Sequence, residues 1–240
     1  MRYTIVLFVG LVCLIGTSSA FSLQDFLYPY KIYPSGTVIL HDRLHGVYLI
    51  KPKRRSFIFN SAGTTAQTLL EQNSWATAVV NASYFGYSGG LFVPAGVYAL
   101  DPSPVDPFYC EKDKNICELL NLDTLSFTGF QFVVKSPTIS AWPVLLNKWV
   151  IPDDVALRYS HRQSRNYRTV ILSTRRGPLF VVTKRQYTLP YLATYIHKLF
   201  GNISALNLDG WSSTTLATAE TTDLFQRNSQ KRLPTFFILY

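Results

Sequence analysis

The sequence predicts an α+β fold, in which a single domain has a mixed β-sheet core with helices packed on it. Short runs of apolar and β-branched residues recur along the chain and suit strands, whereas two longer segments carry apolar residues at helical spacing. Each helical segment precedes a strand-like run that ends in a polar residue, Asn81 in one case and Asp209 in the other. If those strands are neighbours, both polar ends line one edge of the sheet.

The expected strands are the apolar runs bounded by turn residues. They cover residues 37–40, 47–50, 56–59, 77–80, 97–100, 130–134, 144–150, 169–173, 179–182 and 205–209. Gly89-Gly90 marks a turn between strands, and the stretch 101–121, with its prolines and two cysteines, indicates a surface insertion.

Both expected helices have recognisable start signals. The first covers 66–72, with Thr64 or Thr65 as its N-cap. The second begins after Thr188, presents one apolar stripe over 189–200, and ends at Gly201, which tolerates a left-handed conformation. It leads directly into the strand at 205–209.

The N-terminus has the pattern of a secretion signal. Arg2 precedes the apolar run 5–15, and Ser18-Ser19-Ala20 supplies small residues for cleavage after about Ala20. A signal anchor is the alternative, but the run is short for spanning a bilayer. Removing residues 1–20 leaves about 220 residues. We expect an N-terminal extension at 21–35 and one domain at 36–240, secreted or periplasmic and without stable membrane insertion.

Two cysteines remain after signal removal, Cys110 and Cys117. In an oxidising compartment they are expected to form a disulfide that closes a short surface loop. The histidines give no metal-binding pattern, since His41 and His45 are four apart in a strand-turn region rather than on a helix. No cofactor or metal site is predicted, although an oxygen-ligated divalent cation would leave little trace in a sequence.

The basic residues gather before one expected strand. The chain has a formal net charge of +9, while charged residues make up 15% and aromatic residues 15% of it. Arg158, His161, Arg162, Arg165 and Arg168 precede the strand at 169. For any single one of them a solvated loop is the simpler interpretation. Arg168 differs because it begins an apolar strand, which would hold its side chain rigidly. Its planar guanidinium could then bind a phosphate through two hydrogen bonds. Nucleic-acid binding is the alternative, disfavoured by export and by the lack of a binding motif.

The segment Ala205-Leu-Asn-Leu-Asp-Gly-Trp-Ser-Ser213 combines a buried strand with a polar loop. Alternation places Asn207 and Asp209 on one face, Gly210 permits a turn, and the hydroxyl groups of residues 212–215 follow. Taken alone, the segment is more often an ordinary Asp-Gly turn than an active-site edge.

Three motifs in order change that balance, because together they resemble the phosphodiester glycosidase family. Asn81-Ala-Ser-Tyr-Phe85 resembles the family's NGGFF, Tyr167-Arg-Thr169 resembles its PRT, and ALNLDGWSSTTL (205–216) resembles its ALNLDGGGSSTL. The match covers roughly residues 36–240. Trp211 and Ser212, like Ala82-Ser83, stand where the family has glycines, so a narrowed pocket, a sugar-stacking Trp211 or lost activity are all open.

The resemblance implies hydrolysis of a sugar-1-phosphodiester at the glycosidic bond. It places Asp209, Arg168 and Asn81 in catalysis, with Asp209 as nucleophile, base or charge stabiliser and Arg168 as the phosphate clamp. The substrate-binding residues it implies are Asn207, Gly210, Ser213, Trp211, Phe85 and Arg165. A second carboxylate is not evident, with Asp101, Asp123 and Glu220 as candidates.

Two other functions remain open at this point. The substituted glycines and the missing second carboxylate fit a catalytically inactive protein that binds anionic glycans at the same site. The positive charge alone fits a non-specific polyanion binder, whose affinity would collapse with salt.

Overall fold

The computed structural model describes residues 30–82, 84–94, 98–99, 103–104, 118–121, 127–128, 133–134, 138–141, 144–146, 164–174, 177–201, 203–219 and 230–240. Several sequence predictions fall outside these residues. They are the signal segment 1–20, the Cys110–Cys117 disulfide, the basic residues Arg158, His161 and Arg162, and the candidate acids Asp101, Asp123 and Glu220.

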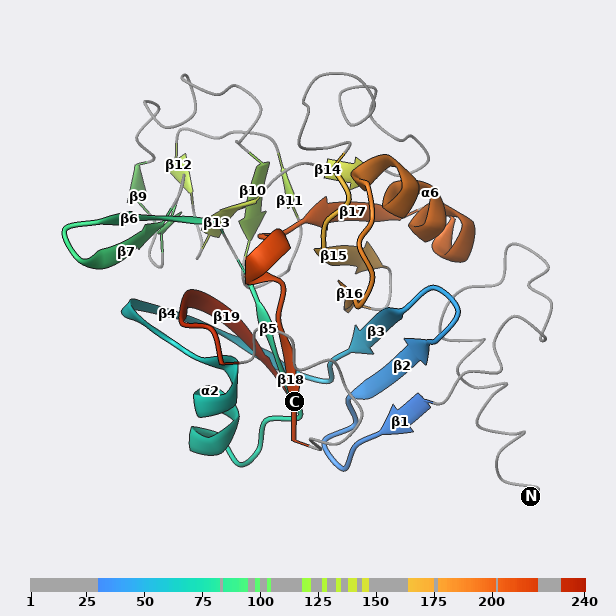
Figure 1. Cartoon of the computed structure of the whole chain (residues 1–240), viewed down its shortest axis with the longest axis horizontal. Helices are drawn as coiled ribbons and strands as arrows, with labels where there is room; N and C mark the ends of the chain where they lie inside the picture. The colour runs from blue at the N-terminus through green and yellow to red at the C-terminus, as the bar shows by residue number, and fades with distance from the viewer. Residues whose placement is uncertain are drawn as a thin grey trace.

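Two principal sheets carry the fold (Figure 1). The seven-stranded sheet has the order β1 (Tyr30–Ile32), β2 (Val38–Asp42), β3 (Val47–Lys51), β16 (Gly177–Thr183), β15 (Thr169–Thr174), β17 (Ser204–Asn207) and β14 (Val144–Leu146). The four-stranded sheet has the order β18 (Leu216–Thr218), β5 (Ala78–Asn81), β19 (Leu233–Leu239) and β4 (Arg55–Thr64).

The core is divided into three clusters by these two sheets. Between the sheets, Tyr48 and Phe180 of the larger one pack with Phe237 of the smaller one. On its other face the larger sheet is covered by α6 (Leu189–Phe200), and the smaller sheet by α2 (Ala66–Gln72). The layers therefore run helix, sheet, sheet, helix. Each large apolar side chain buried between these layers contributes roughly 1.5–3 kcal/mol to the free energy of folding.

Both predicted helices are confirmed, together with their caps. Thr65 accepts a hydrogen bond from the Thr68 N–H at 3.0 Å, and Thr188 accepts one from the Tyr191 N–H at 3.3 Å. Gly201 ends α6 with φ of +64°, a conformation in which an L side chain is strained.

The prediction of a mixed sheet is wrong, because every registered strand pair among the described residues is antiparallel. A mixed sheet requires at least one pair of parallel neighbours, which the two strand–helix–strand units could supply. In fact α2 connects β4 with β5, and both strands pair with β19, which lies between them. In the same way α6 connects β16 with β17 on either side of β15. Each crossover is thus split by an antiparallel strand from elsewhere in the chain.

The remaining described strands are short. The hairpin of β6 (Phe85–Ser88) and β7 (Leu91–Pro94) turns at Gly89-Gly90, as predicted. The others are β8 (Tyr98–Ala99), β9 (Ser103–Pro104), β10 (Glu118–Asn121), β11 (Phe127–Thr128), β12 (Val133–Val134) and β13 (Thr138–Ala141). The described helices include none long and apolar enough to cross a membrane.

Candidate functional site

The polar ends of β5 and β17 meet, although the two strands belong to different sheets. The Asn81 Nδ2 donates to the main-chain carbonyl of Asp209 at 2.5 Å, and the Asp209 N–H donates to the Ala82 carbonyl at 3.0 Å. The two strands are not neighbours in one sheet, so the condition for both ends to line one sheet edge is not met. They adjoin because the sheets stack. We call Asn81, Arg168, Asp209 and Gly210 the strand-end junction.

Asn81 is the connecting residue of this junction. Only 1% of it is exposed, and its Oδ1 accepts hydrogen bonds from the Thr169 hydroxyl at 2.6 Å and from the Thr215 N–H at 3.0 Å. One carboxamide thus fastens β5 to the start of β15 and to both sides of the 209–215 loop. This geometry gives Asn81 a positioning role for Asp209, and direct contact with a substrate stays a prediction.

Asp209 is partly buried, and its carboxyl has an unusual acidity. Burial raises its pKa to about 6, while hydrogen bonds from Ser213 and the Gly210 N–H and the positive charge of Lys231 act in the opposite direction. A carboxyl group with this pKa is mostly ionised at neutral pH and still exchanges protons readily, as a general acid or base requires.

Arg168 is held rigidly, as its place at the start of an apolar strand predicts. It is 7% exposed; its Nε donates to the Tyr187 carbonyl at 3.3 Å and its Nη2 to the Ser164 carbonyl at 3.0 Å. Burial lowers the pKa of the guanidinium, which nevertheless stays charged at neutral pH.

The lack of a side chain at Gly210 brings its loop close to Arg168. A Cβ there would lie 3.0 Å from the Tyr167 carbonyl oxygen and 3.9 Å from Arg168 Nη1. The Gly210 backbone is extended, so glycine is needed here for close approach rather than for its backbone angles. The loop that carries Asp209 and Gly210 therefore lies directly against the Tyr167–Arg168 segment.

Trp211 occupies a backbone conformation that favours glycine. Its φ is +56°, and it is the one non-glycine residue of the described chain with positive φ. The residue is 69% exposed, and its N–H donates to the Tyr167 carbonyl at 2.9 Å. The indole is thus presented to solvent beside the junction. The other departure from glycine is different, because the Ala82 methyl lies in the core between the sheets.

The other predicted substrate-binding residues differ in position. Asn207 is buried, and its Nδ2 donates a hydrogen bond to the Tyr84 hydroxyl at 2.6 Å. Ser213 forms a side-chain hydrogen bond with the Asp209 carboxyl. Phe85 packs against the cluster under α2, with its ring centroid 5.2 Å from that of Phe92. Arg165 is exposed next to Ser164.

The sequence interpretation missed Lys231 and Tyr84. The Lys231 Nζ donates to the carbonyl and the hydroxyl of Ser212, at 3.1 and 2.6 Å, and its charge acts on Asp209. No local pattern marks Lys231, whereas Tyr84 lies inside the NASYF motif. Within the described part of the chain, no three His, Cys, Asp or Glu residues gather as metal ligands.

Three solved structures are similar to this chain. The catalytic domain of zebrafish N-acetylglucosamine-1-phosphodiester alpha-N-acetylglucosaminidase, auto-inhibited by its pro-peptide, is similar in fold, with a TM-score of 0.53 and 15% identity over 94% of this chain and 87% of that one. A hypothetical protein from Synechocystis has a TM-score of 0.49 and 13% identity over 88% of this chain and 61% of that one. A protein from Burkholderia pseudomallei, named as an exported protein, has a TM-score of 0.48 and 12% identity over 87% of this chain and 75% of that one.

No curated protein matches this chain in sequence. The model of the phosphodiester glycosidase (NAGPA) family does match, over residues 74–240, which include every member of the strand-end junction. The chain therefore belongs to the phosphodiester glycosidase family.

Proposed function

We propose that this chain is an exported hydrolase that cleaves the glycosidic bond of a sugar-1-phosphodiester in an envelope or extracellular glycoconjugate. The observation that carries the proposal is the junction itself, where a carboxyl with a pKa of about 6 and a buried guanidinium are held in fixed positions. Family membership supports the reaction type. Export rests on the N-terminal pattern at 1–20.

The leaving group of this reaction needs little assistance from the protein. The C1–O bond breaks with its electron pair passing to a phosphate monoester, which leaves readily and needs little protonation. Water adds to C1 and loses a proton. Ionised Asp209 stabilises the positive charge that develops on the sugar and is the group that accepts this proton.

The cationic residue has the complementary task. The Arg168 guanidinium binds the phosphodiester oxygens, and its fixed fork makes that binding directional. Ser213 and Asn81 keep the Asp209 loop in place through their hydrogen bonds. Trp211 offers an exposed indole face on which a sugar ring can stack.

A screen of sugar-1-phosphodiesters, such as nitrophenyl-phospho-sugars, tests the proposal with wild type and Asp209→Asn in parallel. Free sugar should be released by wild type, and in oxygen-18 water the label should enter the sugar and not the phosphate. The Asp209→Asn variant should fold and release none, whereas Glu71→Gln, which removes an exposed carboxylate of α2, should match wild type. Full activity in Asp209→Asn would overturn the assignment of Asp209.

A second candidate is a binding protein for phosphate-bearing glycans that performs no hydrolysis. Trp211 favours it, because a bulky residue stands at a backbone position suited to glycine beside the carboxyl. Calorimetry decides between the two functions. Saturable binding of an intact phosphodiester, with no sugar released over a long incubation, supports the binding protein and excludes the hydrolase.

A further inference from the structure

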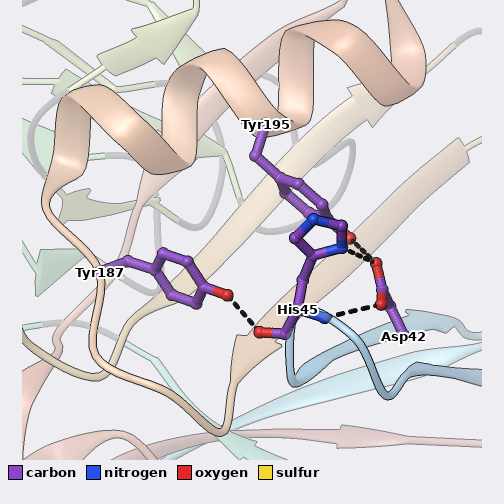
Figure 2. Close-up of polar contacts among 4 residues, drawn as sticks. All are labelled: Asp42, His45, Tyr187 and Tyr195. Atoms are coloured by element: carbon purple, nitrogen blue, oxygen red, sulfur yellow. Dashed lines mark hydrogen bonds and ion pairs between the residues drawn. The ribbon is translucent and has the colours of Figure 1, made fainter.

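Tyr187 connects two hydrogen-bond networks that the sequence keeps far apart. Its hydroxyl donates to the main-chain carbonyl of His45 (Figure 2). Its own main-chain carbonyl accepts the Arg168 Nε at 3.3 Å and the Asn166 N–H at 3.1 Å. One residue therefore bridges the turn after β2 and the guanidinium of the strand-end junction.

The turn at the far end of this bridge is itself fixed. Asp42 is 5% exposed, and its carboxylate accepts the His45 N–H at 2.9 Å, the His45 Nδ1–H at 2.7 Å and the Tyr195 hydroxyl at 2.7 Å. Tyr195 extends from α6, as Figure 2 shows. Three donors around one buried carboxylate make a rigid anchor for the His45 carbonyl.

The near end of the bridge bears on the orientation of Arg168. The guanidinium is held by two main-chain carbonyls, Ser164 on Nη2 and Tyr187 on Nε. With those two contacts made, Nη1 is the nitrogen near Gly210, 3.9 Å from where a Cβ would stand. A shift of the Tyr187 carbonyl would rotate the Arg168 guanidinium and move its Nη1 away from Gly210.

The hydroxyl of Tyr187 is suited to a permanent contact. Burial raises the pKa of the Tyr187 phenol above its usual range, so the group stays protonated and donates throughout the neutral range. Its ring also stacks on that of Tyr191, with centroids 5.4 Å apart and planes at 17°. Removal of the hydroxyl alone should leave this stacking in place.

We propose that Tyr187 is a positioning residue for the Arg168 guanidinium, and that the Asp42–His45–Tyr195 network is the anchor from which it acts. The catalytic consequence rests on the proposed function of Arg168 in binding a phosphodiester. The positional statement does not, because it concerns the guanidinium itself.

The test is Tyr187→Phe, with Tyr191→Phe as a matched control that removes the hydroxyl of the neighbouring ring. The first readout is solvent exchange of the Arg168 Nε–H, followed by NMR. Exchange should accelerate about tenfold in Tyr187→Phe, the size expected for loss of one hydrogen bond, and stay at the wild-type rate in Tyr191→Phe. Equal exchange in all three proteins would overturn the proposal.

The second readout is kcat/KM for a sugar-1-phosphodiester, which should fall about tenfold in Tyr187→Phe while turnover of a neutral nitrophenyl glycoside is unchanged. Equal losses on both substrates would indicate a merely structural role and contradict the proposal. If wild type hydrolyses no diester, the proposed function fails, while the exchange measurement still decides the positioning role. Should Tyr187→Phe not fold, Tyr195→Phe loosens the same anchor and is expected to raise Nε–H exchange in the same direction.

Discussion

The carboxamide of Asn81 donates a hydrogen bond of 2.5 Å to the main-chain carbonyl of Asp209, across 128 positions of sequence and from one sheet to the other. The bond fixes the backbone of the residue that we propose as catalytic. The carboxyl of Asp209 stays available because Asn81 holds the main chain and not the side chain.

Asn81→Asp should therefore destabilise the protein and abolish activity together. The change replaces the donor with an oxygen facing the Asp209 carbonyl, inside a site that is 1% exposed. We expect a loss of about 2 kcal/mol in the free energy of unfolding, measured with urea. Asn60→Asp is the control, because the exposed Asn60 Oδ1 accepts the Ala62 N–H and the substitution keeps that acceptor. An equal effect of both changes would contradict the role given to Asn81.

Asp209→Asn should be more stable than wild type at neutral pH. The pKa of Asp209 is about 6 in the folded state, above its ordinary value of 3.8, so ionisation favours the unfolded chain. Wild type should lose up to roughly 3 kcal/mol of unfolding free energy between about pH 4 and pH 6. The variant should not lose it, and the difference should stay constant at higher pH. Urea unfolding of both proteins from pH 3.5 to 8 checks this, and a difference independent of pH would contradict the raised pKa.

Arg168→Lys should impair the phosphodiester reaction selectively. Lysine keeps the charge but cannot reproduce the planar guanidinium, which donates to the carbonyls of Ser164 and Tyr187 and which we propose binds the phosphate. We expect kcat/KM for a sugar-1-phosphodiester to fall about 100-fold, with much smaller change for a neutral nitrophenyl glycoside. Arg54→Lys, at an exposed arginine far along the chain, should behave as wild type. Equal losses on both substrates would remove the phosphate role of Arg168.

The positions of most helices and strands can be predicted from the sequence, but the pairing of the strands cannot. Thr188, the apolar stripe of α6 and Gly201 lie within one segment, so local signals are enough to place that helix. The runs that form β15 and β17 are equally local. In contrast, β19 was not among the predicted strands, although its seven residues are all buried and it separates β4 from β5. It pairs with residues 155 to 184 positions away, which no local pattern indicates, and without it β4 and β5 would be taken as parallel neighbours.

The candidate site likewise combines residues that the sequence identifies with contacts that only the structure shows. Asp209, Gly210 and Arg168 stand in ordered motifs and could be named from the sequence. The contacts that set their chemistry come from elsewhere: Lys231 acts on the Asp209 carboxyl, and Tyr187 holds the Arg168 guanidinium. Trp211 is the opposite case, since only the structure reveals that this residue has a φ of +56°, a conformation that favours glycine.

Substitutions of Trp211 separate backbone strain from sugar binding. Trp211→Gly and Trp211→Ala both remove the exposed indole, but only glycine relieves the positive φ. The glycine variant should therefore be more stable than the alanine variant by about 1 kcal/mol, as followed by urea unfolding. Both should bind a phosphodiester more weakly by a similar factor, whereas Trp75→Ala, at another exposed indole, should not. Equal stability of the two variants would indicate that Trp211 carries no backbone strain.

Lys231 should set the pH range in which the proposed hydrolase is active. Its positive charge lowers the pKa of Asp209 against the effect of burial, so Lys231→Met should raise that pKa further. In the proposed mechanism activity requires the ionised Asp209 carboxylate. The rising limb of the kcat–pH profile should therefore move upward by roughly half a pH unit, as expected for one partly exposed charge. Lys231→Arg keeps the charge and should keep the wild-type limb. Lys198→Met, at an exposed lysine in the last turn of α6, controls for the general loss of positive charge. The same midpoint in wild type and Lys231→Met would show that Lys231 does not act on Asp209, and its contacts with Ser212 would then serve the loop alone.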